Sequence, residues 1–439
     1  MKCRYAVFVA LLLLVFKPES VTAETTNGLS LSSVTAPDLL PFQGIQPQLP
    51  QSYQTASKQS FESLADAVLT YENIQNNGRW RTFSAGPLLR QGDRHPQVSQ
   101  LKAHLQWLGD LPSQDVLSLG SRLFDQALHQ ALLRFQARHS IKADGVLGPK
   151  TRALLNVPPW QRIDQLVLNM YRQQQNEIND DVYLHINLPE YNLRFYQFGE
   201  VLLEMRAVVG KRTRQTPEFS AAVTKLIINP DWNVPKSIAY RDILPKLHDD
   251  PEFLRKRNLR VVSGWQLPRV EVPEHQVDFN RMYQGAEYYR FWEPPGETNT
   301  LGRMKFQLDS DNSIYLHDTQ QKYLFDAESR AFSSGCIRLE SPRALADTLM
   351  RVANQWTPEV LDPLLDGPDM IKLRVGKNIL VHVTYWTAWL DKRGVLNFAN
   401  DMYERDSVDF AVMQERQREH REEVDVAANW LKTVQVGTP

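Results

Sequence analysis

The stretch that decides the fold of this chain runs from Ile314 to Leu349 and reads IYLHDTQQKYLFDAESRAFSSGCIRLESPRALADTL. It begins with an alternating run that is typical of a β-strand and that ends at His317. Cys336 follows nineteen residues later in the run SSGCIRL, and a Ser-Pro pair after it marks the start of a helix. This spacing allows a strand and a returning loop to bring the imidazole and the thiol together.

Cys336 is one of only two cysteines, and the other, Cys3, lies in a segment typical of a secretion signal. An exported protein with one remaining cysteine cannot use it for an internal disulfide. A buried and inert thiol is the common fate of a lone cysteine. The Ser-Ser-Gly run before Cys336 and the guanidinium of Arg338 after it instead favour a nucleophile.

A thiol reacts as the thiolate, and a free cysteine with a pKa of about 8.5 is mostly protonated near neutral pH. It therefore needs a base or a nearby positive charge, and His317 is the best candidate for the base. We expect N–H groups around Gly335 and Cys336 to form an oxyanion hole. Tyr315 is equally compatible with supporting the strand and with touching substrate. The candidates for the oxyanion and substrate-binding positions are Tyr315, Ser334, Gly335 and Arg338.

The N-terminal residues predict export from the cytoplasm. Residues 1–4 carry two positive charges, residues 5–16 are apolar, and Val21-Thr22-Ala23 offers a small-residue cleavage site. The apolar run is short for a membrane span, so we expect a signal peptide over 1–23, with an uncleaved inner-membrane anchor as the alternative. Residues 24–56 are rich in Ser, Thr, Gln and Pro and predict a flexible linker. We therefore expect a periplasmic protein.

The rest of the chain divides by its apolar periodicity. Helical spacing predicts a helical scaffold segment over 57–84 and a small helical unit over 85–156. Alternating runs between 180 and 395, with few helices among them, predict an antiparallel β domain rather than a βαβ fold. Residues 236–296 are charged and partly helical, as an insertion would be, and 396–439 predict a C-terminal segment with a helix. The predicted class is α+β.

The stretch from Ile314 to Leu349 closely resembles the active-site segment of L,D-transpeptidases. The resemblance continues through NPDWNVPKSI (229–238), PPGETNTLGRMKF (294–306) and YWTAWLD (385–391), and it covers most of residues 180–405. It is closest to the long Gram-negative murein subgroup. Many members have His where this chain has Ser334 and Gly where it has Asp318, so the group that orients the catalytic histidine is left open.

This resemblance implies a function in cell-wall synthesis. Cys336 would attack the L,D bond of a tetrapeptide stem and release D-Ala, with His317 as general base. The thioester would pass to a diaminopimelate side-chain amine and form a 3→3 peptidoglycan cross-link, without metal or organic cofactor. The insertion over 236–296 would act as a lid. The family also implies acylation of Cys336 by carbapenems.

Residues 85–156 resemble the small three-helix peptidoglycan-binding domain. The string runs from LRQGDRHPQVSQLKAHLQWLGDL to FDQALHQALLRFQARHSIKADGVLGPKTRALLN, and its Asp-Gly-x-x-Gly-x-x-Thr run is fairly specific. The apolar residues of this unit are explained by packing alone. The resemblance adds an expected ligand, which is the glycan or the stem peptide of the cell wall.

Composition and motifs leave three classes of function. A net charge of −1 without a basic run argues against nucleic acid as a partner. No histidine pair has metal-binding spacing, which disfavours a zinc amidase. The classes are a transpeptidase that makes cross-links or attaches proteins to the wall, a wall-anchored L,D-carboxypeptidase or cysteine hydrolase, and a non-catalytic wall-binding protein. Stem peptides and carbapenems are the expected partners, with other wall-synthesis enzymes as a further option.

Overall fold

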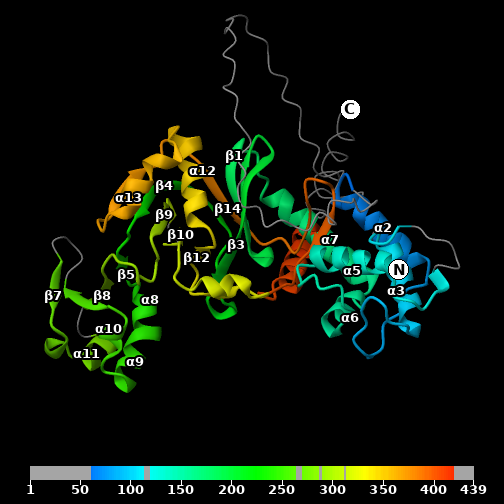
Figure 1. Ribbon diagram of the computed structural model, residues 1–439, viewed down its shortest axis with the longest axis horizontal. Helices are drawn as coiled ribbons and strands as arrows, with labels where there is room; N and C mark the ends of the chain where they lie inside the picture. The colour runs from blue at the N-terminus through cyan, green and yellow to red at the C-terminus, as the bar shows by residue number, and fades with distance from the viewer. Residues whose placement is uncertain (1–60, 113–118, 264–268, 286–288, 311–312, 420–439) are drawn as a thin grey trace, which may run out of the picture.

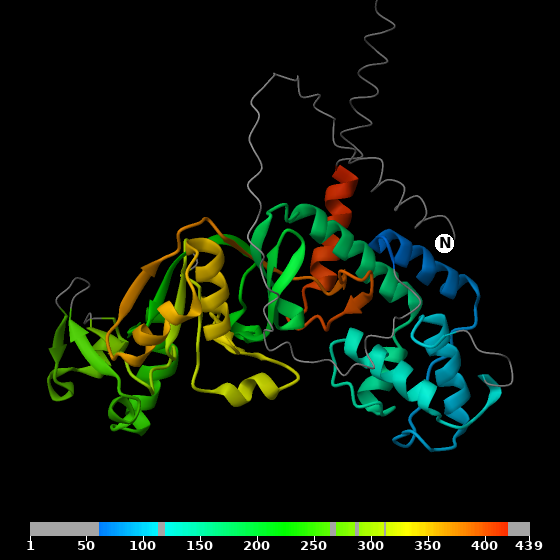
Figure 2. The ribbon, with the colours of Figure 1, turned by 45° about the horizontal axis from the view of Figure 1, so that its top comes forward.

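The computed structural model describes residues 61–112, 119–263, 269–285, 289–310 and 313–419. The predicted signal peptide, the linker and residues 420–439 of the C-terminal segment lie outside the described residues. Figure 1 shows a helical unit at one end of the molecule, a large sheet in the middle and a smaller mixed unit at the other end, and Figure 2 shows the same order from another side. The predicted α+β class is confirmed.

The central sheet has the strand order β11-β3-β12-β10-β9-β4-β14-β1-β2, with β13 paired to β4. Because β2 also pairs with β3, this order closes on itself. Most pairs are antiparallel, as predicted, but β1–β14, β10–β12 and β11–β3 are parallel. The strands are β1 (Val182–Asn187), β2 (Asn192–Gln197), β3 (Glu200–Gly210), β4 (Phe219–Ile228), β9 (Met304–Leu308), β10 (Tyr315–His317), β11 (Ala331–Ser333), β12 (Ile337–Leu339), β13 (Ile371–Arg374) and β14 (Leu380–Thr384).

Alternating apolar residues of these strands form the largest core of the molecule. Leu184 and Ile186 of β1, Phe306 of β9 and Ile337 of β12 are fully buried in it. Helix α12 (Pro342–Asn354) contributes Leu345 and further apolar residues to the same core. Burying such a side chain stabilises the fold by about 1.5–3 kcal/mol. The helix begins at Pro342, directly after β12, and packs its apolar face against the sheet.

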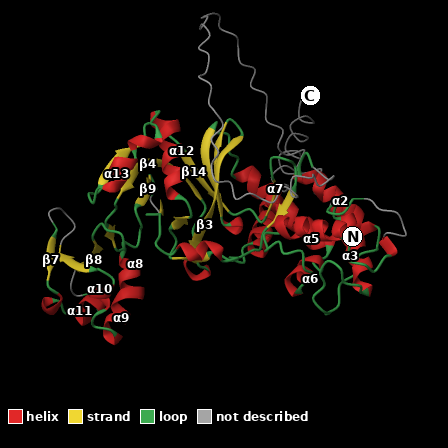
Figure 3. Cartoon of the chain, in the orientation of Figure 1, coloured by secondary structure: helices red, strands yellow, loops and turns green. Residues whose placement is uncertain are grey.

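The insertion between β4 and β9 forms a unit with its own core, and Figure 3 shows that it combines strands with short helices. Its small sheet has the order β5-β8-β6-β7. It corresponds to the predicted insertion over 236–296, but its first strand already begins at Trp232. The elements are β5 (Trp232–Asn233), α8 (Lys236–Ile238), η4 (Ala239–Ile243), α9 (Leu244–Asp249), α10 (Phe253–Lys256), β6 (Arg260–Ser263), β7 (Val270–Val272), η5 (Glu274–Gln276), α11 (Phe279–Tyr283) and β8 (Tyr289–Glu293).

Three helices form the unit that was predicted over 85–156: α3 (Pro96–Trp107), α5 (Gln126–Arg138) and α6 (Pro149–Leu155). Their apolar stripes share one core. Asp125 caps α5 by accepting a hydrogen bond from a backbone N–H of its first turn. Arg138 forms a buried two-pronged ion pair with Asp110, at 2.8 and 2.6 Å. The unit is thus held by an apolar core and one buried charge pair.

A further core joins the N-terminal helix, the linking helix and the end of the chain. It contains α2 (Leu64–Asn76), α7 (Pro159–Gln175), the hairpin of β15 (Ala388–Leu390) and β16 (Leu396–Phe398), and the helix that begins at residue 406. Residue 395, which we expected to end the β domain, lies inside this hairpin. None of the described helices combines the length and the apolarity that crossing a membrane requires.

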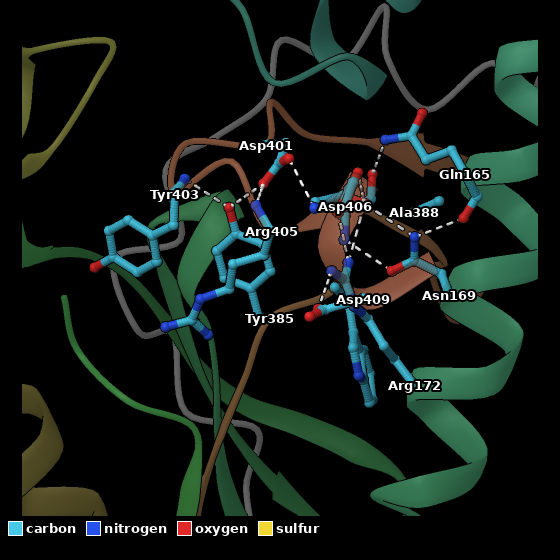
Figure 4. A network of polar contacts seen from close by, with 12 residues as sticks. Gln165, Asn169, Arg172, Tyr385, Ala388, Asp401, Tyr403, Arg405, Asp406 and Asp409 are labelled. Atoms are coloured by element: carbon cyan, nitrogen blue, oxygen red, sulfur yellow. Dashed lines mark hydrogen bonds and ion pairs between the residues drawn. The ribbon is translucent and has the colours of Figure 1, made fainter. Parts of the chain in front are cut away.

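Figure 4 shows the polar network that fixes α7 to the C-terminal segment. The guanidinium of Arg172 pairs with Asp406 at 2.7 Å and with Asp409 at 2.5 Å. Asn169, on the same helix, donates to the hydroxyl of Thr387 at 2.9 Å. Because Arg172 is only 6% exposed, its charge depends on these two carboxylates. The C-terminal segment is therefore anchored where it approaches the sheet.

Candidate active site

The candidate nucleophile and base lie on neighbouring parallel strands. In the pairing of β10 with β12, His317 lies opposite Arg338, and the same register places Tyr315 opposite Cys336. The hydroxyl of Tyr315 comes within hydrogen-bonding reach of the Cys336 thiol. Cys336 is partly exposed rather than sealed in the core. The fold therefore brings together the strand end and the SSGC loop that the sequence singled out.

His317 lies between two cations in a row of residues that crosses the sheet. Lys305 on β9 is its direct partner on one side and Arg338 on β12 on the other. Directly opposed residues of neighbouring strands project to the same face. Both cations act on the imidazole and on the thiol of Cys336. The site is thus positively charged although the whole chain is nearly neutral.

The imidazole of His317 is neutral at rest. Burial lowers the pKa of His317 to about 3, and the positive charges of Arg338 and Lys305 act in the same direction. The backbone of Asp318 and Leu301 next to the ring opposes this shift. Only 4% of His317 is exposed, and its Nδ1 has no hydrogen-bond partner among the described residues. A neutral imidazole can accept a proton from a thiol, which a general base requires.

The thiol of Cys336 is also neutral at rest. Burial raises its pKa, while Tyr315, Lys305 and Arg338 oppose that rise. Burial likewise raises the pKa of Tyr315, which keeps its hydroxyl protonated. The thiol of Cys336 and the imidazole of His317 are therefore both neutral in the resting site, and the surrounding cations favour the thiolate once the proton leaves.

Two side-chain hydroxyl groups hold the backbone of Gly335, the residue before the nucleophile. Gly335 has φ +119°, a conformation that favours glycine. The fully buried hydroxyl of Thr216 donates to the carbonyl of Gly335 at 2.7 Å. The N–H of Gly335 donates to Ser333 at 3.1 Å, so this N–H already has an acceptor. The expected oxyanion hole thus has no free donor at Gly335 in this state.

Thr216 is itself tied to the C-terminal segment. Its hydroxyl accepts from the N–H of Gly210 at 2.9 Å, and its N–H donates to the hydroxyl of Tyr403 at 3.2 Å. Tyr403 in turn donates to the carbonyl of Gly210 at 2.6 Å and stacks on Tyr385. The end of the chain therefore supports the loop that carries Cys336.

Ser334 connects the nucleophile loop to the insertion. Its exposed side chain accepts from Arg214 at 2.8 Å, and the same guanidinium pairs with Asp242 on η4 of the insertion at 2.8 Å. The Arg214 side chain is 16% exposed and that of Asp242 is 35% exposed. This chain of contacts is the polar link between the base of the insertion and the residue two positions before Cys336.

Two parts of the sequence match known protein families. Residues 181–381 match the YkuD family, described as "L,D-transpeptidase catalytic domain". Residues 94–155 match the family described as "Putative peptidoglycan binding domain". Residues 181–381 form an L,D-transpeptidase catalytic domain. The expected family resemblance and the helical peptidoglycan-binding domain are both confirmed.

One curated protein and several solved structures are similar to this chain. A protein named "Putative L,D-transpeptidase" from Haemophilus influenzae is 31% identical over 222 residues, which are 50% of this chain and 44% of that relative. An L,D-transpeptidase structure from Stackebrandtia nassauensis is 12% identical, covers 69% of this chain and 96% of its own, and has a TM-score of 0.24. One from Xylanimonas cellulosilytica is 14% identical, covers 69% and 99%, and has a TM-score of 0.22. The chain spans less than half of the Haemophilus relative.

Asp318, a departure from many L,D-transpeptidases, does not orient the histidine. Its carboxylate accepts from the backbone N–H groups of Arg303 and Thr319 at 2.9 and 2.7 Å and pairs with Lys322 at 2.7 Å. It also packs against Gly302, where an added Cβ would lie 2.3 Å from a carboxylate oxygen. Asp318 therefore clamps the loop beside His317, and the groups that hydrogen-bond the imidazole belong to the backbone.

Sequence reasoning missed several residues of this L,D-transpeptidase site. Lys305 comes from β9, and Arg214 and Thr216 come from the loop between β3 and β4. Lys305 lay inside a quoted family segment, GRMKF, and its place in an alternating run after Gly302 was the one available signal. Nothing in the local pattern around Thr216 or Arg214 marks them, because their roles depend on contacts with a loop more than a hundred residues away.

Proposed function

We propose that this protein is a murein L,D-transpeptidase that forms 3→3 cross-links between peptidoglycan stems. The observation that carries the proposal is the register of β10 and β12, which sets Tyr315 beside Cys336 and places His317 on the same face. The catalytic-domain match over 181–381 supports the same chemistry. An unpaired, partly exposed thiol with a neutral imidazole on the adjacent strand suits acyl transfer through a thioester.

In the first half-reaction, the sulfur of Cys336 attacks the carbonyl of the third stem residue, a diaminopimelate. The thiol proton passes to His317, and the C–N bond to the terminal D-Ala then breaks. His317 returns the proton to the departing amine, so D-Ala leaves and a thioester remains. Because Lys305 and Arg338 favour negative charge at this face, they stabilise the developing thiolate.

In the second half-reaction, the side-chain amine of a diaminopimelate on a neighbouring stem attacks the thioester. The new amide bond forms, the C–S bond breaks, and the proton lost by the amine restores the Cys336 thiol through His317. The energy of the cleaved peptide bond is kept in the thioester. The reaction therefore needs no nucleotide, which suits the periplasm that the N-terminal residues predict.

Two other parts of the chain support this reading. The insertion is linked to the nucleophile loop through Asp242, Arg214 and Ser334, so a lid would move together with that loop and exclude water from the thioester. The three-helix unit would bind the wall and raise the local concentration of stems. Carbapenems, whose strained amide offers a similar carbonyl, would acylate Cys336.

The test is product analysis by mass spectrometry after incubation of a disaccharide tetrapeptide with the purified protein. We expect free D-Ala and a cross-linked dimer from wild type, and neither from Cys336→Ala. A tripeptide product without dimer would instead identify an L,D-carboxypeptidase. Transfer of the stem to an added protein lysine would identify an enzyme that attaches proteins to the wall. If neither wild type nor Cys336→Ala reacts, wall binding would be the function that remains.

A further inference from the structure

Lys305 is a cation of the active-site face that has no anionic partner in the part of the chain that the structure describes. Among the described residues no carboxylate lies within ion-pair distance of its Nζ, which instead sits 3.9 Å from the centre of the Tyr315 ring. It belongs to the middle of the sheet, on β9 between β4 and β10. A half-buried ammonium at such a position is costly unless an anion joins it.

The nearest carboxylate is already occupied. Asp231 acts on Lys305 from a distance, but it pairs with Arg269 at 2.5 Å and accepts from the indole of Trp292 at 2.9 Å. Arg338, the other cation of the row, donates to Gln321 at 2.7 Å. Among the described residues neither cation of this row pairs with a carboxylate, and only Arg338 has a hydrogen-bond partner, so the ammonium of Lys305 is the cation with the fewest protein contacts.

Other polar groups around Lys305 also await a partner. The Nε–H of Arg338 and the Nδ1 of His317 are buried without a hydrogen-bond partner among the described residues. Buried polar groups normally have partners. Their gathering around one thiol indicates a place for a polar ligand whose negative charge faces Lys305.

We propose that Lys305 binds the terminal carboxylate of the donor stem, the α-carboxylate of the D-Ala that leaves. This inference rests on the proposed function and names a substrate contact for it. The scissile bond lies one residue from the chain end, so the carboxylate and the attacked carbonyl are separated by no more than about 3.6 Å. The Nζ of Lys305 lies 3.9 Å from the centre of the Tyr315 ring, and the strand register sets Tyr315 opposite Cys336, so the ammonium is placed to reach that carboxylate.

This contact would determine how many residues the donor stem peptide has. A stem that ends one residue after the scissile bond presents its carboxylate to Lys305, whereas a stem with one more residue presents a neutral amide there. A site built to pair a charged group rejects the analogue that lacks it. Lys305 would thus select tetrapeptide donors over pentapeptide donors.

The test measures binding, so it does not depend on turnover. The tetrapeptide and its C-terminal amide are titrated calorimetrically into Cys336→Ala protein, and then into the same protein with Lys305→Met, Lys305→Arg or Lys372→Met. Lys372 is an exposed lysine on β13, two strands from Lys305 in the sheet. Its replacement by Met is the control, because it removes the same charge at a different position. We expect the acid to bind about 10- to 100-fold more tightly than the amide unless Lys305→Met is present, with partial preference retained by Lys305→Arg.

Two results would overturn the proposal. One is that the Lys305→Met protein still binds the acid more tightly than the amide. The other is that Lys372→Met abolishes this difference in affinity as fully as Lys305→Met does, which would mean that the overall positive charge of the face, and no specific contact, attracts the carboxylate. Alkylation of the Cys336 thiol by iodoacetamide across pH, in protein that keeps the cysteine, shows separately whether Lys305 acts on the sulfur. If wild type binds the acid selectively yet releases no D-Ala, the proposed function fails while the carboxylate site stands.

Discussion

Replacement of Thr216 by Val tests how the nucleophile loop is held. The two side chains have the same shape, but Val lacks the hydroxyl that donates to the Gly335 carbonyl and accepts from the Gly210 N–H. Thr216 is 0% exposed, so both backbone groups would lose their partner in a place without water. Each such group costs about 1–3 kcal/mol, which predicts a loss of about 2–6 kcal/mol in the free energy of unfolding.

The same replacement should slow the reaction. Gly335 would lose the contact that fixes its left-handed backbone, and the sulfur of Cys336 would no longer be held against Tyr315. A displacement of about 1 Å at a reacting atom can cost about 100-fold in rate. We therefore expect slower D-Ala release and slower carbapenem acylation in Thr216→Val.

The assays are urea unfolding followed by tryptophan fluorescence and intact-protein mass spectrometry of carbapenem acylation. Thr216→Ser is the matched control, because it keeps the hydroxyl and loses one methyl group, worth about 1 kcal/mol. Equal unfolding energies and equal acylation rates for the Val and Ser variants would refute this account of the loop.

Four further outcomes are expected. His317→Gln should slow acylation of the thiol by at least about 100-fold while leaving the protein folded, and an unchanged carbapenem acylation rate would remove His317 as the base. Asp242→Asn should raise the ratio of hydrolysis to transfer, because it weakens the link between Arg214 and the insertion, and an unchanged product ratio would count against the lid. Arg172→Met should cost about 3–5 kcal/mol in urea unfolding, since it leaves Asp406 without its buried partner, and a loss below 1 kcal/mol would contradict this. Because the pKa of His317 falls to about 3 on folding, the unfolded chain binds more protons between pH 6.5 and 3, so unfolding energy should drop as pH falls through that window, less steeply in His317→Gln.

Much of the fold could be predicted because its cores follow simple periodicities. The stripe of Leu128, Leu132 and Phe135 became the buried face of α5, and Leu184 and Ile186 became buried positions of β1. The parallel pairing of β10 with β12 could not be predicted. These strands have three residues each, and their partnership is decided by packing across the whole sheet.

Helix α7 shows why the length of a helix is hard to predict from apolar spacing. Its apolar positions Ile163, Leu166 and Val167 lie in its first half, whereas the helix runs through 17 residues. Its later turns are held by Asn169 and Arg172, which are buried polar side chains and leave no apolar signal. The same contacts anchor the predicted C-terminal helix where it begins, since Arg172 pairs with Asp406, and Met413 further along it is fully buried.

The candidate site also contains residues that could be predicted from the sequence and residues that could not. Cys336 and His317 could be chosen from the sequence because the chemistry restricts which residue types can serve. Gly335 was expected to offer a free N–H, and the structure instead shows it donating to Ser333. The supporting residues Thr216 and Lys305 follow from contacts between distant segments, which no local pattern encodes.

The most direct measurement is the mass of the acyl-enzyme. Wild-type protein is mixed with disaccharide tetrapeptide, quenched in acid within the first turnover, digested and mapped by mass spectrometry. The account predicts an adduct on the peptide that contains Cys336, with the mass of the stem minus D-Ala, and its loss on treatment with hydroxylamine. An adduct on any other residue, or release of D-Ala by Cys336→Ala protein, would contradict it.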